Sequence, residues 1–286
     1  MPWFPDFVSA IELARNQTRD AGHADPVGRY FAALTKGDSH LLERLWPGEV
    51  VVHDPWAGEI RGRKQLRDYV RQNQSWLAAH HVTIETIASI CAEGRAVVEM
   101  LAQLPGSGRR EVAWPIAVVA ESPDERSVVF RTYCSLWPVD GRRHLRPPLL
   151  QPGQAHPGDV VARYQAGLAD GDAGAVVSTF APNGYYREPI GTHATHRGAN
   201  ELLSFFTSRF TDGGIGLQHC AVTDDSVRCA VEYNAVRWGS HTCSRRRDSA
   251  STSAALTGCS LLSASTTTSK RPPRAREPHG TDGVAG

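Results

Sequence analysis

The sequence has no excess of charge of either sign. It contains 31 Lys and Arg against 30 Asp and Glu, which leaves a formal net charge of +1 over 286 residues. Proteins that hold nucleic acid or an anionic membrane by electrostatics need a field of positive charge. The even balance therefore argues against both as partners.

Two further absences concern metal sites and membranes. The six cysteines include no CxxC pair and no metal-ligand spacing with histidine, so neither a zinc site nor any other metal is expected. No apolar run approaches the roughly 20 residues that span a bilayer. The N-terminal residues MPWFPD lack the basic-then-apolar order of a signal peptide. We expect a cytoplasmic protein with reduced thiols.

The end of the chain lacks aromatic residues. Residues 242–286 contain 15 Ser or Thr among 45 residues, no aromatic residue and few large aliphatic ones. Such a segment cannot bury enough apolar surface to offset the conformational entropy lost on folding. Residues 241–286 are therefore predicted to be a disordered tail.

What the sequence does contain is a repeat. Residues 25–55 match residues 159–189 without a gap at an offset of 134, and the echo continues at an offset of 136. In both copies a tyrosine precedes a carboxylate-proline step by 24 residues, as Tyr30 precedes Asp54 and Tyr164 precedes Glu188. A repeat of this length indicates a duplicated domain, because solenoid repeats are much shorter.

The repeat and the changes in composition give the expected organisation. The predicted segments are an N-terminal helical extension (1–22), a first domain (23–143), a proline-rich linker (144–158), an incomplete second domain (159–240) and the tail (241–286).

The local patterns indicate an α+β fold with helices followed by strands. Leu66, Tyr69, Val70 and Asn73 form one stripe of a helix predicted over Lys64–Ala79. Turn residues separate four strand-like segments, which predicts an antiparallel meander. The segments are Val82–Ile90, Arg95–Leu104, Glu111–Ala120 and Ser127–Leu136. A curved sheet covered by helices on one face forms a cone with an internal cavity.

The second copy has no counterpart of the last two strands, which are missing where the low-complexity tail begins. One hypothesis is a reading-frame shift near the codons for residues 239–242, because Asp248–Lys270 read one base out of register can encode strand, turn and strand. The alternative is a native disordered tail after a truncated domain.

Each copy resembles the SnoaL-like branch of the NTF2-like superfamily, which includes ketosteroid isomerases, polyketide cyclases and limonene-type epoxide hydrolases. The resemblance rests on the tyrosine that lies seven residues before a Gly-Asp step (Gly37-Asp38) and 24 before the carboxylate-proline step (Asp54-Pro55). It implies two tandem cone domains, the second incomplete, with a ligand between the helices and the sheet.

The same resemblance implies catalytic roles. Asp54 would be the general base and Tyr30 a hydrogen-bond donor to a developing enolate, with Glu188 and Tyr164 in these roles in the second copy. The ketosteroid isomerases use a protonated aspartate as a second hydrogen-bond donor to the enolate oxygen. Here the strand at Glu111 has no Asp and contains Pro115.

The expected function is open between two classes. One is a cofactor-independent enzyme, an isomerase or cyclase, that transfers a proton on an apolar carbonyl compound. The other is a non-catalytic ligand-binding or dimerising module, in which Asp54 caps a turn and Tyr30 is a core tyrosine. Glu99 and Glu232 are expected to face solvent or a dimer partner on the sheet face. The residues expected to line the ligand pocket, or otherwise to belong to the core, are Trp46, Trp56, Trp76, Trp114 and Phe180.

Overall fold

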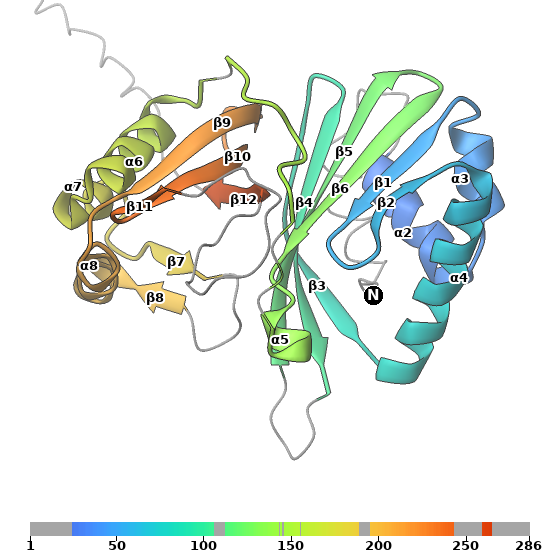
Figure 1. Cartoon of the computed structure of the whole chain (residues 1–286), viewed down its shortest axis with the longest axis horizontal. Coiled ribbons are helices and arrows are strands. Elements are labelled where there is room, and N and C mark those ends of the chain that lie inside the picture. Colours follow the sequence, from blue (N-terminus) through green and yellow to red (C-terminus); the bar gives the residue numbers. More distant parts are fainter. Residues whose placement is uncertain are drawn as a thin grey trace, which may run out of the picture.

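The protein consists of two α+β halves whose sheets face each other, with helices on both outer sides (Figure 1). The computed structural model describes residues 25–105, 112–142, 144, 146–154, 156–188, 195–242 and 259–264. We call residues 25–142 the first half and residues 159–242 with 259–264 the second half. The predicted N-terminal extension, residues 1–22, lies outside the described residues.

The first half begins with two short helices that the sequence caps locally. In α2 (Pro26–Lys36) the side chain of Asp25 accepts a hydrogen bond of 2.9 Å from the backbone N–H of Gly28. Gly37, at φ 70°, ends this helix in a left-handed conformation that glycine adopts without steric cost. Asp38 then caps α3 (Ser39–Leu45) in the same way.

The third helix, α4 (Arg63–His80), covers the inner face of the first sheet. Its buried residues are the predicted stripe of Leu66, Tyr69, Val70 and Asn73. This helix therefore presents two hydrophobic side chains, a phenol and an amide to the interior of the first half.

The first sheet has six strands in the order β2-β1-β6-β5-β4-β3. The strands are β1 (Val50–Asp54), β2 (Gly58–Arg61), β3 (Thr83–Ala92), β4 (Arg95–Leu104), β5 (Val112–Asp124) and β6 (Ser127–Cys134). The predicted antiparallel meander is formed by β3 to β6, and β1 then joins β6 in parallel. Pro115 does not interrupt the sheet, because the register between β4 and β5 runs unbroken through the pair Leu101–Pro115.

The two faces of the first sheet have different surroundings. The inner face packs against α2, α3 and α4 and forms the main core, whose members include Val52, Met100, Trp114 and Phe130. The outer face carries a smaller cluster that contains Val119 and Tyr133, and this cluster includes Ala230 of the second half. The predicted α+β fold with a curved sheet is confirmed.

The second half follows the same order of elements as far as its second long strand. Its helices are α6 (Asp159–Asp170), α7 (Ala173–Val177) and α8 (Gly198–Arg209), and its strands are β7 (Tyr185–Arg187), β8 (Thr195–Arg197), β9 (Ile215–Asp224) and β10 (Cys229–Trp238). The strands β7 and β8 form a separate two-stranded sheet. A short helix, α5 (Trp137–Asp140), precedes the linker between the halves.

Two further strands lie in the segment predicted to be the disordered tail, residues 241–286. The strand β11 (His241–Thr242) pairs with the end of β10, and β12 (Cys259–Ala264) pairs antiparallel with Cys229–Asn234 of β10. Eight residues of the predicted disordered tail, 241–242 and 259–264, thus form strands. The other residues after 242, including most of the segment concerned in the frame-shift hypothesis, lie outside the described residues.

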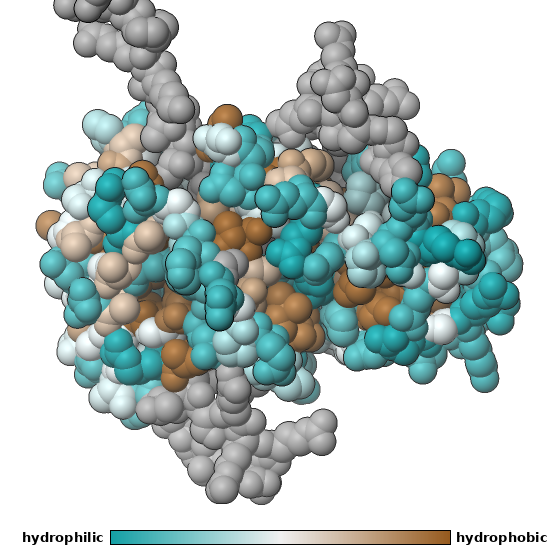
Figure 2. All heavy atoms as spheres, turned by 90° about the horizontal axis from the view of Figure 1, so that it is seen from above, coloured by the Kyte–Doolittle hydropathy of each residue, from teal (hydrophilic) through white to brown (hydrophobic). Residues whose placement is uncertain are grey.

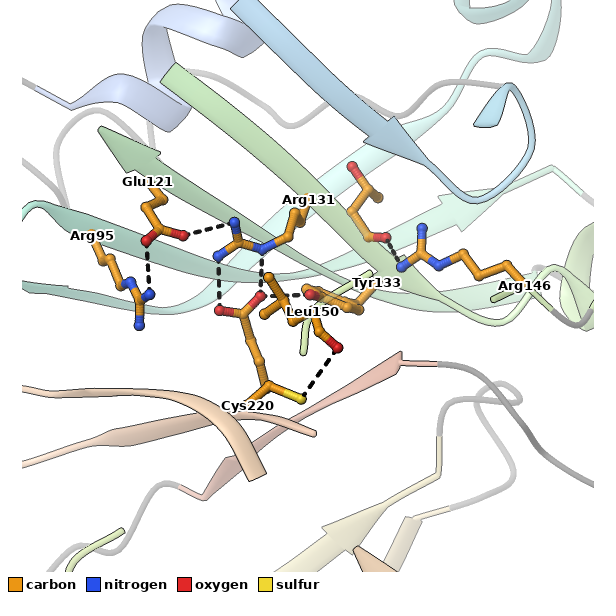
Figure 3. A network of polar contacts seen from close by, with 9 residues as sticks. Arg95, Glu121, Arg131, Tyr133, Arg146, Leu150 and Cys220 are labelled. Atoms are coloured by element: carbon orange, nitrogen blue, oxygen red, sulfur yellow. Dashed lines mark hydrogen bonds and ion pairs between the residues drawn. The ribbon is translucent and has the colours of Figure 1, made fainter. Parts of the chain in front are cut away.

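The halves meet where the outer face of the first sheet, the face away from its helices, packs against β10 of the second half. Arg131 on β6 forms two hydrogen bonds to the Glu232 carboxylate, of 2.6 and 2.9 Å, and the Tyr133 hydroxyl donates a third of 2.5 Å (Figure 3). Glu232 is 2% exposed, so it is buried between the halves and does not face solvent. Arg131 also pairs with Glu121, which in turn pairs with Arg95.

The linker lies along this junction. Leu149 packs against the outer-face cluster, and the Leu150 carbonyl accepts a hydrogen bond of 3.1 Å from the Asn234 side chain. The sheet face that the sequence offered for a homodimer is therefore occupied, in this structure, by the second half of the same chain.

The outside of the molecule shows small hydrophobic patches separated by hydrophilic residues in the view of Figure 2. The large hydrophobic side chains with the greatest exposure belong to different elements and connecting segments of both halves: Trp56, Trp137, Tyr185, Leu203 and Val227. In the part of the chain that the structure describes, no helix is both long and apolar enough to cross a bilayer.

The buried carboxylate at the junction generates a first prediction. Replacing Glu232 with Ala leaves the Arg131 guanidinium buried without its main partner, which should lower the free energy of unfolding by about 3–5 kcal/mol. Denaturant unfolding of the full chain measures this change. The exposed Glu85 on β3 offers a matched control, for which Glu85→Ala should change stability by less than about 0.5 kcal/mol. Similar effects of the two substitutions would contradict a structural role for the junction.

A second prediction concerns acid. Burial acts to raise the pKa of Glu121, but the hydrogen bond and charge of Arg95 and the charge of Arg131 outweigh it and hold the pKa below its usual range. A carboxyl with a depressed folded-state pKa contributes stability above its unfolded pKa of about 4.3, and this is lost as pH falls through the folded value. The stability difference between the parent and Glu121→Gln should therefore shrink as the pH falls below about 4.3, the unfolded pKa. A difference that does not depend on pH would refute this.

Candidate functional site

Asp54 lies at the end of β1, where the chain turns. The β-branched run Val50–Val52 favours a strand, and Pro55 then removes a backbone donor and ends it. In the turn, Asp54 Oδ1 accepts hydrogen bonds of 2.8 Å from the backbone N–H groups of both Trp56 and Ala57. The side chain is 1% exposed, so the turn places a carboxylate inside the first half.

Two tyrosines extend from this carboxylate as a chain of hydrogen bonds. The Tyr69 hydroxyl donates to Asp54 Oδ2 over 3.1 Å, and it lies 2.8 Å from the Tyr30 hydroxyl. A phenol has one proton to donate. Because Tyr69 gives its proton to Asp54, Tyr30 must donate to Tyr69 in this arrangement.

Both phenols are held in their neutral form. Burial raises the pKa of Tyr30, and although the hydrogen bond to Tyr69 acts in the opposite direction, the Asp54 charge adds to the rise. Burial, the charge of Asp54 and the neighbouring Tyr30 raise the pKa of Tyr69 well above its ordinary value. The two hydroxyls are therefore donors at neutral pH, next to a carboxylate that accepts three hydrogen bonds.

Aromatic side chains enclose this hydrogen-bonded chain. The Tyr30 ring stacks on Phe130 with a centroid separation of 4.2 Å, and the Trp46 ring packs edge-on against Phe130 with a centroid separation of 5.5 Å. Burial, reinforced by the charge of Asp54, also raises the pKa of the Cys134 thiol well above its ordinary value. The polar groups are thus set in apolar surroundings.

The interior is filled by side chains. Tyr30, Phe130, Trp114 and Met100 are all fully buried. A shallow depression is open to solvent elsewhere, at Gly48 and residues 124–127, at the turn between β5 and β6. This depression belongs to the turn and not to the site around Asp54.

The predicted pocket tryptophans have different environments. Trp114 is fully buried with its indole N–H donating to the Ser135 carbonyl, Trp46 is 8% exposed, and Trp76 packs against the core from α4. Trp56 is different, because it is 43% exposed on the turn after Asp54 and lies near His144. Trp56 therefore does not line the interior.

In the second half, the predicted pair is separated. Tyr164 packs edge-on against Phe180 and Phe206 in an apolar cluster, and burial raises its pKa well above the ordinary value. Glu188 instead binds the Arg209 guanidinium over 2.7 Å and the His196 ring over 3.1 Å. The structure shows no hydrogen bond between Tyr164 and Glu188 within its described residues.

The residues that align at an offset of 136 explain why the two carboxylates have different partners. Under this alignment Tyr69 corresponds to Phe205, Asn73 to Arg209 and Ile60 to His196. The connecting phenol of the first half is therefore a phenylalanine in the second, and a guanidinium and an imidazole take its place beside the carboxylate. Sequence reasoning did not identify Tyr69 as a site residue. Two signals could have found it: Tyr69 lies on the predicted buried stripe of α4, and the aligned residue of the second half, Phe205, lacks the hydroxyl.

Among the residues that the structure describes, no group of three or more His, Cys, Asp or Glu side chains could hold a metal ion. What the site contains is one carboxylate and two phenols, which are groups for hydrogen bonding and proton transfer.

Comparisons with known proteins agree with this picture of the first half. Residues 27–141 match the family model of the SnoaL-like domain. A search of curated proteins found no significant match.

Several solved structures are similar. A protein with a ketosteroid isomerase-like fold from Catenulispora acidiphila, in complex with trimethylamine, is 19% identical, with 42% of this chain and 92% of that chain covered and a TM-score of 0.32. The Δ5-3-ketosteroid isomerase from Mycobacterium sp. is 13% identical, with coverages of 38% and 88% and a TM-score of 0.30. The epoxide hydrolase/cyclase-like enzyme SalBIII, of pyran ring formation in salinomycin, is 20% identical, with coverages of 37% and 86% and a TM-score of 0.28.

The family match spans α2 to α5 and includes Tyr30, Asp54 and Tyr69. Residues 27–141 of this chain are therefore similar to the SnoaL-like domain, and this part of the chain has the α+β fold described above.

Proposed function

We propose that the SnoaL-like domain binds an apolar carbonyl compound and transfers a proton on it, with Asp54 as the proton acceptor and no metal or organic cofactor. The observation that supports this is the continuous hydrogen-bonded chain from Asp54 through Tyr69 to Tyr30, enclosed by aromatic side chains. Proton transfer next to a carbonyl needs a base and a donor for the enolate oxygen. The chain supplies both kinds of group.

The chemistry follows from the direction of these hydrogen bonds. Asp54 removes a proton from the carbon next to the carbonyl, the C–H electron pair forms the enolate, and the negative charge moves to the carbonyl oxygen. Protonated Asp54 can then donate to Tyr69, Tyr69 to Tyr30, and Tyr30 to the enolate oxygen. Return of the proton from Asp54 to a different carbon completes an isomerisation. Protonation of the carboxylate thus reverses the direction of the hydrogen bonds, so that the Tyr30 hydroxyl becomes free to donate to the enolate oxygen.

Entry of the substrate requires an opening. Asp54 is 1% exposed and the Tyr30 ring is fully buried, so the substrate must displace packed side chains to reach them. Binding that requires a conformational change is slower than docking on a preformed surface. We therefore expect association to be slow in comparison with rigid sites.

We assign the reaction to the first half. Glu188 in the second half already engages both carboxylate oxygens with Arg209 and His196, and Tyr164 is not hydrogen-bonded to it. The phenol that would connect them is Phe205. Glu188 and Tyr164 accordingly lack the arrangement on which the proposal rests.

A second candidate is a non-catalytic binding or dimerising module. The observation that favours it is that Asp54 is fully hydrogen-bonded, with two of its donors in its own turn, as expected for a structural cap. In that case the phenols are core residues with satisfied hydroxyls. Activity measurements distinguish the two candidates.

The decisive test is turnover of a steroid enone by the full chain. Replacing Asp54 with Asn removes the proton acceptor but keeps an oxygen for the turn, and should lower kcat by about 10²–10⁴. Tyr30→Phe should lower it by about 10²–10³, because the enolate loses its donor. Tyr185→Phe, at an exposed tyrosine of the second half, is the matched control and should leave kcat unchanged. Equal rates for the parent and Asp54→Asn would end the catalytic proposal.

The hydrogen-bonded chain also has a stability consequence. Tyr69→Phe leaves Asp54 Oδ2 and the Tyr30 hydroxyl without partners in a buried setting, which should lower the free energy of unfolding by about 1–3 kcal/mol. Denaturant unfolding measures this, with Tyr185→Phe again as the control. A loss in Tyr69→Phe no larger than in the control would show that the chain does not form.

A further inference from the structure

The helix α4 carries a buried amide next to the Asp54 site. The Asn73 side chain is 1% exposed, and its Nδ2 donates to the Tyr69 carbonyl over 2.7 Å. That bond sets the orientation of the amide, because only the NH₂ group can donate. Asn73 Oδ1 is then the free end, and it is buried without a hydrogen-bond partner.

One turn further on, a second polar atom is also unsatisfied. The indole Nε1 of Trp76 is buried and has no hydrogen-bond partner. The ring is held in place by packing against the core on one side and by stacking on His80, with a centroid separation of 4.2 Å, on another. Buried polar groups in folded proteins nearly always have partners. Two unsatisfied atoms so close in sequence therefore point to a ligand.

The two atoms lie on the same side of α4 as Tyr69. Side chains three and four positions apart on a helix are neighbours, and Asn73 follows Tyr69 by four while Trp76 follows Asn73 by three. In the second half the aligned residue, Arg209, contacts the carboxylate of Glu188 directly, whereas the shorter Asn73 bonds the backbone of Tyr69, whose hydroxyl binds the carboxylate. The equivalent carboxylate in the first half is Asp54.

We propose that Asn73 Oδ1 and Trp76 Nε1 together bind a hydroxyl group of the substrate. Asn73 Oδ1 can only accept a hydrogen bond and Trp76 Nε1 can only donate one. A hydroxyl group satisfies both, whereas a carbonyl satisfies Trp76 alone and an ammonium group satisfies Asn73 alone. The proposal rests on the proposed function and narrows its substrate class to hydroxylated apolar carbonyl compounds.

The test compares ligands that differ in one hydroxyl group. A panel of steroid enones, each with a single hydroxyl at a different position, and the enone without a hydroxyl are titrated into the full chain by calorimetry. At least one hydroxylated member should bind tenfold or more tightly than the unsubstituted enone, since a site built to hydrogen-bond a group rejects analogues that lack it. Equal affinities across the panel, or no binding of any member, would overturn the proposal.

Substitutions assign the preference to the two side chains. Asn73→Leu and Trp76→Phe should each reduce the preference for the hydroxylated ligand to about twofold or less, while Trp137→Phe, at an exposed tryptophan on α5, should keep it. The indole ¹⁵N–¹H resonance that Trp76→Phe removes should shift on binding of the hydroxylated enone and not of the unsubstituted one. A preference that persists in both variants would also overturn the proposal.

The same experiment separates this subsite from the reaction. In Asp54→Asn the preference should remain, because the hydroxyl contacts are on α4, even though turnover is lost. If Asp54→Asn keeps full turnover while Asn73→Leu loses the preference, the hydroxyl site stands and the proton-transfer proposal fails. If turnover depends on Asp54 but no ligand of the panel is preferred, the proton-transfer proposal stands and the hydroxyl site fails.

Discussion

The contact between the two halves depends on one buried ionic group, the Glu232 carboxylate. Two bonds from Arg131 and one from Tyr133 satisfy it in a place where water is excluded (Figure 3). Burial acts to lower the pKa of Arg131, but its hydrogen bond and ion pair with Glu232 outweigh this and keep it charged. A buried charge is tolerated only with such partners, so Glu232 and Arg131 must stay paired while the two halves are in contact.

This junction divides the roles of the two faces of the first sheet. The outer face is used for contact with the second half, so the inner face and its three helices remain as the only enclosure around Asp54 in the described structure. Asp54 obeys the same rule as Glu232, because a buried carboxylate needs donors on both oxygens. In the first half these donors are a turn and a phenol, and in the second half the corresponding Glu188 has a guanidinium and an imidazole.

The two halves thus share an order of elements but differ in the chemistry around the carboxylate. Three aligned positions account for the difference, where Tyr69, Asn73 and Ile60 are replaced by Phe205, Arg209 and His196. A neutral phenol can donate a hydrogen bond to a carboxylate or accept one from a carboxylic acid, whereas a guanidinium stays charged and holds the carboxylate as an ion pair. The two halves are therefore more alike in their order of elements than in the groups around the carboxylate.

Much of the fold and part of the candidate site could be predicted from the sequence. The cap at Asp25, the stripe of α4 and the meander of β3 to β6 are determined by local patterns, since capping, helical periodicity and turn chemistry act over a few residues. Tyr30 and Asp54 could be singled out by their spacing. The tertiary structure alone decided that Tyr69 connects them, that Trp56 faces outward and that Glu232 is buried. Each of these depends on contacts between segments far apart in the chain, and neither periodicity nor spacing encodes which distant side chain will satisfy a buried charge.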